Sequence, residues 1–336
     1  MFRKYGLSAF ALFSALILIL AGCSSKENKI ASKDSKDKIV VYTALYPLQY
    51  FTERIGGEYV EVNNMMPFGG DAHTFEPTSK ELTKVAEADL FIESGGGIEM
   101  FVEKLEDSMK NENVTFVTAS KGIQLLEVTA DSHAHEGKAT TDEHGHENEA
   151  TEEDEHEGHN HGNVDPHVWL DPIFSIDMAE NIKNELVKKQ PEQKEVFEKN
   201  FASLKTDLQN IDENFKKVTE EADQKAFIVS HKAYGYWANR YGLEQIGIAG
   251  LSSTNEPSQK QLTEIIEIAK EKDIKYVIYE QNVTPKVAKV IETEIGAKTL
   301  RLHNLASLTE EDYKEKKDYV ALMNENIETM KTALTK

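Results

Sequence analysis

Apolar residues along this chain recur with two spacings: short β-branched runs, and longer stretches with an apolar residue every three or four positions. The short runs predict strands and the longer stretches predict helices. In the first half, strands are predicted at residues 38–44, 59–66, 89–94 and 114–118, with helices at 47–56, 78–88 and 98–109 between them. Strands and helices that alternate at these lengths predict parallel sheets covered by helices on both faces.

The second half of the chain repeats this alternation. Strands are predicted at 226–230, 244–249, 274–279 and 298–302, and helices at 234–241, 258–272 and 284–295. A closing helix is marked by Tyr319, Val320, Met323, Ile327, Met330 and Leu334. The second half therefore predicts another parallel sheet with its own helices.

A long helix is predicted between the two halves, at residues 191–222. Its apolar residues form one stripe, made of Val196, Phe197, Phe201, Leu204, Leu208, Ile211, Phe215 and Val218. A helix of this length would span roughly 48 Å, enough to run along two domains. The expected fold is α/β, with two lobes at residues 38–190 and 223–336, each a parallel sheet flanked by helices, joined by this linker helix.

The start of the chain predicts export. Arg3 and Lys4 precede an apolar stretch at residues 7–20, and Leu-Ala-Gly-Cys ends at Cys23. This is the pattern of a signal peptide, residues 1–22, and it is too short for a stable membrane-spanning helix. Its end resembles the lipobox of bacterial lipoproteins, in which the cysteine carries the lipid. Residues 23–37 then form a flexible tether, and we expect the protein at the extracellular face of the cell membrane. The alternative is an ordinary signal peptide with an incidental cysteine.

The charge and the cysteine count of the chain limit the ligands that it can be expected to bind. The formal net charge is −21, which argues against nucleic acid and anionic lipid and suits attraction of cations. Because Cys23 is the single cysteine, no internal disulfide and no thiolate zinc site can form. Residues 131–162 hold eleven acids, seven histidines and almost no apolar residue, so a disordered loop with auxiliary metal-binding capacity is expected. Its histidines are His133, His135, His144, His146, His156, His159 and His161.

Three further histidines lie beside turns, in segments far apart in the chain. His73 follows the second predicted strand, His231 directly follows the strand at 226–230, and His167 precedes the helices that lead to the linker. Ligands of open α/β sheets bind at the carboxyl ends of the strands, and neutral imidazole suits zinc and its late first-row neighbours. We therefore predict a metal site between the lobes; the alternative for each histidine is a hydrogen-bonded structural role.

The sequence allows more than one role for several residues near these histidines. Asp165 and Asp171 could orient the ligands, or either could only cap a turn. The glycines at 95–97 lack the Gly-Lys-Ser/Thr continuation of a phosphate loop and predict a tight turn. His303 also follows a strand, and we expect it at the surface or behind the ligands.

The whole mature chain resembles the cluster A-I solute-binding lipoproteins of bacterial ABC metal importers, specifically the zinc-binding, ZnuA-like group. Beside the lipobox and the histidine-rich loop, the matching segments are 71–77, 95–99, 165–172, 230–231, 247–252 and 256–258. The resemblance implies two α/β lobes around a rigid linker helix, with His73, His167 and His231 as the metal ligands. Manganese-binding relatives have a carboxylate in place of the third histidine.

One departure concerns the fourth ligand. Several relatives supply a carboxylate in the turn after the last strand, where this chain has Ala306. The fourth position would then belong to water or, less favourably, to Glu280, whose alternative interpretation is an acid at a helix N-terminus.

The expected function is capture of Zn2+ as cargo in the inter-lobe cleft and its delivery to an ABC permease by a lipid-anchored monomer that is not an enzyme. One alternative is a manganese-binding importer component. Another is a zinc-dependent hydrolase, since three histidines and a water also describe a catalytic zinc site, although no general base is evident in the sequence. A surface adhesin is the third.

Overall fold

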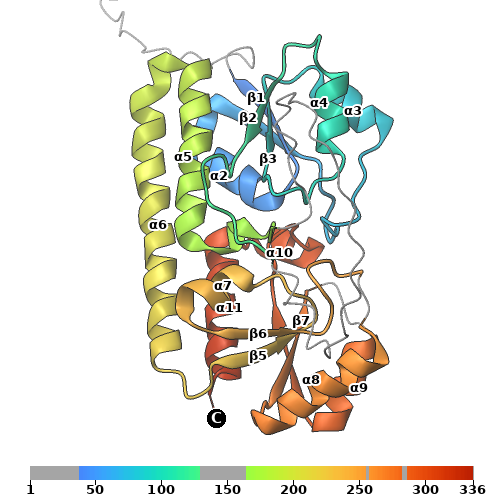
Figure 1. Cartoon of the computed structure of the whole chain (residues 1–336). Coiled ribbons are helices and arrows are strands. Elements are labelled where there is room, and N and C mark those ends of the chain that lie inside the picture. Colours follow the sequence, from blue (N-terminus) through green and yellow to red (C-terminus); the bar gives the residue numbers. More distant parts are fainter. Residues whose placement is uncertain (1–37, 129–163, 255–256, 282–285, 336) are drawn as a thin grey trace, which may run out of the picture. The chain divides into compact units, whose positions relative to one another are not determined.

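Two four-stranded parallel sheets form the framework of the protein in the computed structural model (Figure 1). The first sheet has the order β2-β1-β3-β4, with β1 Ile39–Thr43, β2 Val60–Asn64, β3 Leu90–Glu93 and β4 Thr115–Thr118. The second has the order β6-β5-β7-β8, with β5 Ala226–Val229, β6 Glu244–Gly247, β7 Tyr276–Glu280 and β8 Lys298–Leu302. Every strand pair is parallel, so the predicted α/β class with two parallel sheets is confirmed.

The structure describes residues 38–128, 164–254, 257–281 and 286–335. The predicted signal peptide, Cys23, the tether and the seven loop histidines lie outside these ranges. Lys38–Lys336 form one compact unit, and a large apolar cluster continues from the first sheet to the second. No helix in the described ranges is long and apolar enough to cross a membrane. The division into lobes at residues 190 and 223 stays a prediction.

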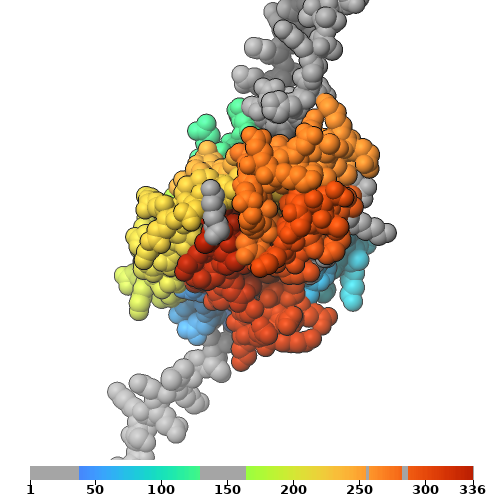
Figure 2. Space-filling model, turned by 90° about the horizontal axis from the view of Figure 1, so that it is seen from below, coloured from blue at the N-terminus to red at the C-terminus, as the bar shows by residue number. Residues whose placement is uncertain are grey.

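Helices cover both sheets. In the first half they are α2 Tyr46–Gly56, α3 Ser79–Val85, α4 Val102–Ser108 and α5 Pro172–Lys189. In the second half they are α7 Gly235–Tyr241, α8 Gln259–Glu271, α9 Lys286–Ile295, α10 Glu310–Glu315 and α11 Tyr319–Ala333. Seen from below, the end of the molecule is covered mostly by residues of this second half (Figure 2). A second, smaller apolar core lies under α8 and α9.

The long helix α6, Lys194–Glu220, runs alongside both sheets (Figure 1). It packs against α2 and α5 from the first half of the chain and against α7 and α11 from the second half. Six of the eight predicted stripe residues are buried, and Val196 and Val218 are half-buried. The helix starts three residues later than predicted because Pro191–Gln193 form a separate 3-10 turn. Through burial of this one stripe, both halves of the chain pack against a single helix.

Two other elements differ from the sequence prediction. The helix expected at 98–109 begins only at Val102, because Glu99 folds back and accepts a hydrogen bond from the Ser94 amide at 2.7 Å. The helix α10 was missed, although Thr309 and Asp312 form the capping box that begins it. The capping boxes that begin α3 and α8 are both present, at Thr78 and Ser258.

The segment after β8 returns to the first half of the chain and fixes the carboxyl ends of both sheets close together. The Tyr46 amide donates to the Ala306 carbonyl at 3.0 Å, and the Gly69 amide donates to the Leu308 carbonyl at 2.8 Å. The Ser307 hydroxyl donates to the Gly70 carbonyl at 2.8 Å. These bonds hold the start of α2 and the loop that follows β2 against the turn that follows β8.

Candidate metal centre

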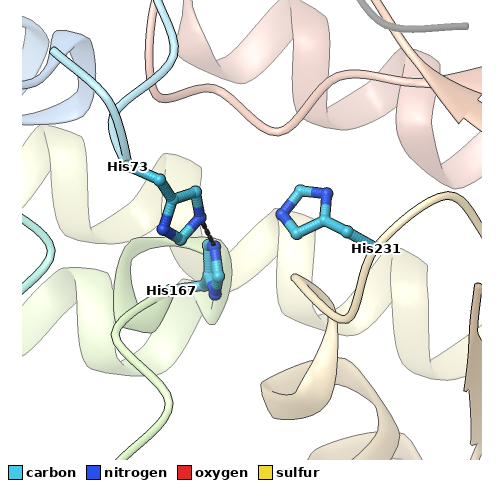
Figure 3. Close-up of side chains that lie close together, drawn as sticks. All are labelled: His73, His167 and His231. Carbon is cyan, nitrogen blue, oxygen red and sulfur yellow. Dashed lines mark hydrogen bonds between the residues drawn. The ribbon is translucent and has the colours of Figure 1, made fainter. Parts of the chain in front are cut away.

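His73, His167 and His231 come from three separate segments and point toward one another (Figure 3). Their candidate ligand atoms all lie within 4.8 Å of one another, and the Nε2 atoms of His73 and His167 are 3.2 Å apart. Two nitrogens bound to one tetrahedral zinc ion at 2.0–2.1 Å would be about 3.3 Å apart. The spacing of this pair therefore already matches shared coordination of one ion.

His73 lies in the loop between β2 and α3. The Asp71 carboxylate accepts a hydrogen bond from the His73 amide at 2.9 Å, which is an Asx turn that fixes the backbone before the histidine. The other Asp71 oxygen accepts from the Ser253 hydroxyl at 2.6 Å, so this carboxylate joins the two halves of the chain beside the site. Asp71 stands two positions before His73, and no motif in the sequence alone marks it as part of the site.

His167 is oriented by Asp165. The same Asp165 oxygen accepts from the His167 amide at 3.0 Å and lies 2.9 Å from His167 Nδ1. With the Nδ1 proton directed at the carboxylate, the Nε2 lone pair of His167 is left for the site. A Cβ on Gly235 would come within 2.4 Å of the second Asp165 oxygen, so glycine is needed there for Asp165 to take this position.

The segment around His167 precedes α6 in the chain, yet α7 from the second half holds it in place. Tyr236 donates to the Asp165 carbonyl at 2.7 Å, and Trp237 donates to the Leu170 carbonyl at 2.6 Å. Asp171 caps α5 by accepting from the amides of residues 173 and 174, and it pairs with Arg240 at 2.5 Å. The sequence allowed both aspartates either to orient a ligand or to cap a turn. In the structure Asp165 contacts a histidine ring, whereas Asp171 caps a helix.

His231 lies two positions after the end of β5 and is 2% exposed. Its Nδ1 lies against Glu280 Oε1, and its Nε2 is buried without a hydrogen-bond partner. Glu280 is the last residue of β7, several positions before α9, so it is not an acid at the helix N-terminus. Its second oxygen accepts from the Asn304 amide at 2.6 Å. An unpartnered buried imidazole nitrogen that faces two other histidines is the arrangement a metal ion would complete.

The electrostatics of the three rings are unequal. Burial and the neighbouring His167 and His231 rings lower the pKa of His73 to about 3. Burial also acts to lower the pKa of His231, but Glu280, together with Asp71 and Asp165, outweighs it and raises the pKa above its ordinary value. Three carboxylates thus surround three imidazoles, a charge distribution that favours a divalent cation.

The cavity between the histidines is very small. Its lining also includes Ile98, Trp169, Glu280, Asn304 and Ala306. The cavity volume open to the centre of a water molecule is about 10 Å³. This is about enough for one ion or one water molecule and far too little for an organic substrate. Ala306 offers no side-chain ligand, and both Glu280 oxygens already have protein partners.

Other candidates fall outside this cluster. His303 is buried rather than at the surface, with its Nε2 3.1 Å from Asp312 Oδ2 and its Nδ1 accepting from the Leu305 amide at 2.9 Å. The three glycines at 95–97 all have positive φ, in keeping with the predicted tight turn. Asn304 and Trp169 line the site without a distinctive motif to mark them in the sequence.

The chain is similar to known zinc-uptake proteins. Residues 41–333 match the family described as zinc-uptake complex component A, periplasmic. The high-affinity zinc uptake system protein ZnuA of Bacillus subtilis is 35% identical over 334 residues, 99% of this chain and 99% of that protein. The zinc-binding lipoprotein AdcA of Streptococcus pneumoniae is 33% identical over 323 residues, which are 95% of this chain but only 59% of AdcA.

The fold is shared with a solved structure of the same kind. The Zn(II)-bound ZnuA-like domain of Streptococcus pneumoniae AdcA superposes with a TM-score of 0.71 at 31% sequence identity. The match covers 89% of this chain and 100% of that domain. The predicted resemblance is therefore confirmed in both sequence and fold.

Proposed function

The chain belongs to the ZnuA family of zinc-uptake components, and we propose that it captures Zn2+ outside the cytoplasm and delivers the ion to an ABC permease for import. The family is a substrate-binding transport component rather than an enzyme. In this proposal Zn2+ is cargo, His73, His167 and His231 are its ligands, and the fourth position is open to water.

One observation carries the ligand assignment: one half-buried and two buried imidazoles converge within 4.8 Å, and the two buried ones have Nδ1 against a buried carboxylate. A carboxylate on Nδ1 leaves Nε2 as the metal-binding atom and makes it a stronger donor. The nitrogen-rich set suits zinc better than manganese, which prefers oxygen ligands.

The same proposal covers the location of the protein and its additional metal-binding residues. The signal-like start and Cys23 support a lipid anchor at the outer face of the membrane, with the described fold held on a tether of residues 23–37. Cation capture is further supported by the acidic charge of the chain. The histidines of the loop at 131–162 would supply additional, weaker zinc binding, and the protein would act as a monomer.

The test is zinc affinity, measured by competition against a chromophoric chelator. Replacement of His73, His167 or His231 with Ala is expected to lower the affinity by more than about 100-fold, beyond the usual effect of losing a group that only orients a ligand. His303→Ala is the matched control, because His303 is also a buried histidine after a strand but does not touch the cluster. Wild-type affinity in any of the first three variants removes that residue from the site.

Two further readouts separate the proposal from its rivals. Zinc uptake by cells that depend on this chain is expected to be lost in the same three variants. The zinc-loaded protein is expected to leave ester and peptide substrates intact, because the cavity has no room for them. Turnover of either substrate would favour a zinc hydrolase, and manganese affinity equal to zinc affinity would favour a manganese importer.

A further inference from the structure

Asn304 forms hydrogen bonds to four residues in or beside the candidate metal centre. Its Nδ2 donates to Glu280 Oε2 at 2.6 Å, while its Oδ1 accepts from Gln281 Nε2 at 3.0 Å and from the Ala306 amide at 3.1 Å. Its backbone amide donates to Gln281 Oε1 at 3.1 Å, and its carbonyl accepts from Trp169 Nε1 at 2.8 Å. All its polar side-chain atoms are engaged, so the direction of the amide is fixed.

The partner that this amide holds is a carboxylate on the wall of the metal cavity. Glu280 is 3% exposed and lines the same small space as the three histidines. One of its oxygens lies against His231 Nδ1, and the other is taken by Asn304. Glu280 is thus beside the cavity, but both of its oxygens are occupied by protein groups.

We propose that Asn304 is a specificity-determining residue, which keeps Glu280 as the orienting partner of His231 and out of the coordination of the metal. The centre then presents three neutral imidazoles, a set that suits zinc. Without the Asn304 amide, Glu280 Oε2 is free to turn toward the ion and add a hard, anionic oxygen. A carboxylate ligand favours manganese and other hard cations. This inference rests on the proposed three-histidine site.

The proposal predicts a change in selectivity rather than a uniform loss of affinity. In Asn304→Ser, the hydroxyl retains an acceptor for the Ala306 amide but ends one bond short of the amide nitrogen that reaches Glu280. The ratio of zinc to manganese affinity is expected to fall by about 10- to 100-fold, the range typical of residues behind metal ligands. Asn304→Ala is a second variant with the same expected direction, and circular dichroism checks that both are folded.

A double variant identifies the group responsible. In Asn304→Ser combined with Glu280→Gln, the ratio is expected to return to that of Glu280→Gln alone, because no carboxylate remains to coordinate. Gln281→Ala is the matched control, since the Gln281 side chain bonds to Asn304, whereas the described bonds of the Glu280 carboxylate go to His231 and Asn304. It is expected to leave the ratio unchanged.

Bound Co2+ supplies a readout that a merely structural role would not move. Its visible spectrum depends on the number and type of the donor atoms, so Asn304→Ser is expected to change it and the double variant to restore it. Equal loss of zinc and manganese affinity with an unchanged Co2+ spectrum overturns the proposal, as does a changed ratio that persists without Glu280. If replacing the three histidines leaves zinc affinity unchanged, that result contradicts the proposed function instead.

Discussion

The Nε2 atoms of His73 and His167 lie 3.2 Å apart although 94 positions separate the two residues in the chain. Two protonated imidazoles would repel each other strongly at this distance, and burial with two neighbouring rings lowers the pKa of His73 to about 3. The cluster therefore holds His73 in its neutral form, the form in which an imidazole can bind a metal ion.

This asymmetry predicts the pH dependence of zinc affinity. The affinity is expected to fall as the pH drops from about 7 to 5, with a slope of no more than about two protons per ion. His73 stays neutral across this range and does not take up a proton. His231, whose pKa is raised by Glu280 against the effect of burial, takes up a proton at a higher pH than free histidine does.

The measurement is chelator competition across this pH range on protein that lacks residues 134–162, so that loop histidines do not contribute. Glu280→Gln removes the charge that raises the pKa of His231, so its affinity loss is expected to begin at a lower pH. A slope of three protons would contradict a neutral His73, and a flat profile would contradict histidine ligation.

The two aspartates near His167 are expected to behave differently. Asp165→Ala should lower zinc affinity by about 10- to 100-fold, because the His167 ring loses the acceptor that directs its Nδ1. Asp171→Ala should leave the affinity close to wild type but lower the free energy of unfolding by about 2 to 4 kcal/mol, through loss of a helix cap and a partly buried ion pair. Zinc competition and urea unfolding on both variants check this, and exchanged phenotypes would reverse the two roles.

Removal of residues 134–162 is expected to leave the fold and the high-affinity site intact. The flanking residues Glu127 and Val164 already pair as a β-bridge, and the Asp165 amide donates to the Leu126 carbonyl at 2.8 Å, so a short connection can close the gap. Calorimetry should show fewer zinc equivalents and the same tightest affinity. Unchanged stoichiometry would argue against an auxiliary metal role, and failure to fold would show that the segment supports the core.

Glu99 predicts a pH effect on stability away from the histidines. It is 5% exposed, and burial together with the nearby Glu93 raises its pKa to about 8 from an ordinary value of 4.5. Between these values the unfolded chain loses this proton while the folded protein keeps it, so this group makes the fold less stable as pH rises.

Glu99→Gln retains an acceptor for the Ser94 amide and removes this ionisation. Relative to wild type, the variant is expected to gain on the order of 2 to 4 kcal/mol at pH 8 and to differ little at pH 4. Urea unfolding at both pH values provides the measurement. A larger gain at the lower pH would mean that the carboxyl is not held protonated in the folded protein.

Local patterns in the sequence predicted most of the elements. The stripe on α6, the capping boxes at Thr78 and Ser258 and the β-branched runs each act within a few residues, so they can be recognised without the rest of the chain. Two expectations failed because of contacts that the periodicity of a segment does not report. The helix α4 starts late because Glu99 bonds back to Ser94, and His303 is buried because it contacts Asp312 and Asn326.

The sequence by itself determined the α/β class, the long helix and the three histidines placed at turns beside buried strands, because periodicity and strand-end position are properties of one segment at a time. Only the tertiary structure decided which groups orient those histidines. Asp165, Asp171 and Glu280 are all acids beside turns, and nothing local distinguishes the two that face an imidazole from the one that caps a helix. That choice depends on how two sheets and the segments at their carboxyl ends pack against one another, which no single stretch of the chain encodes.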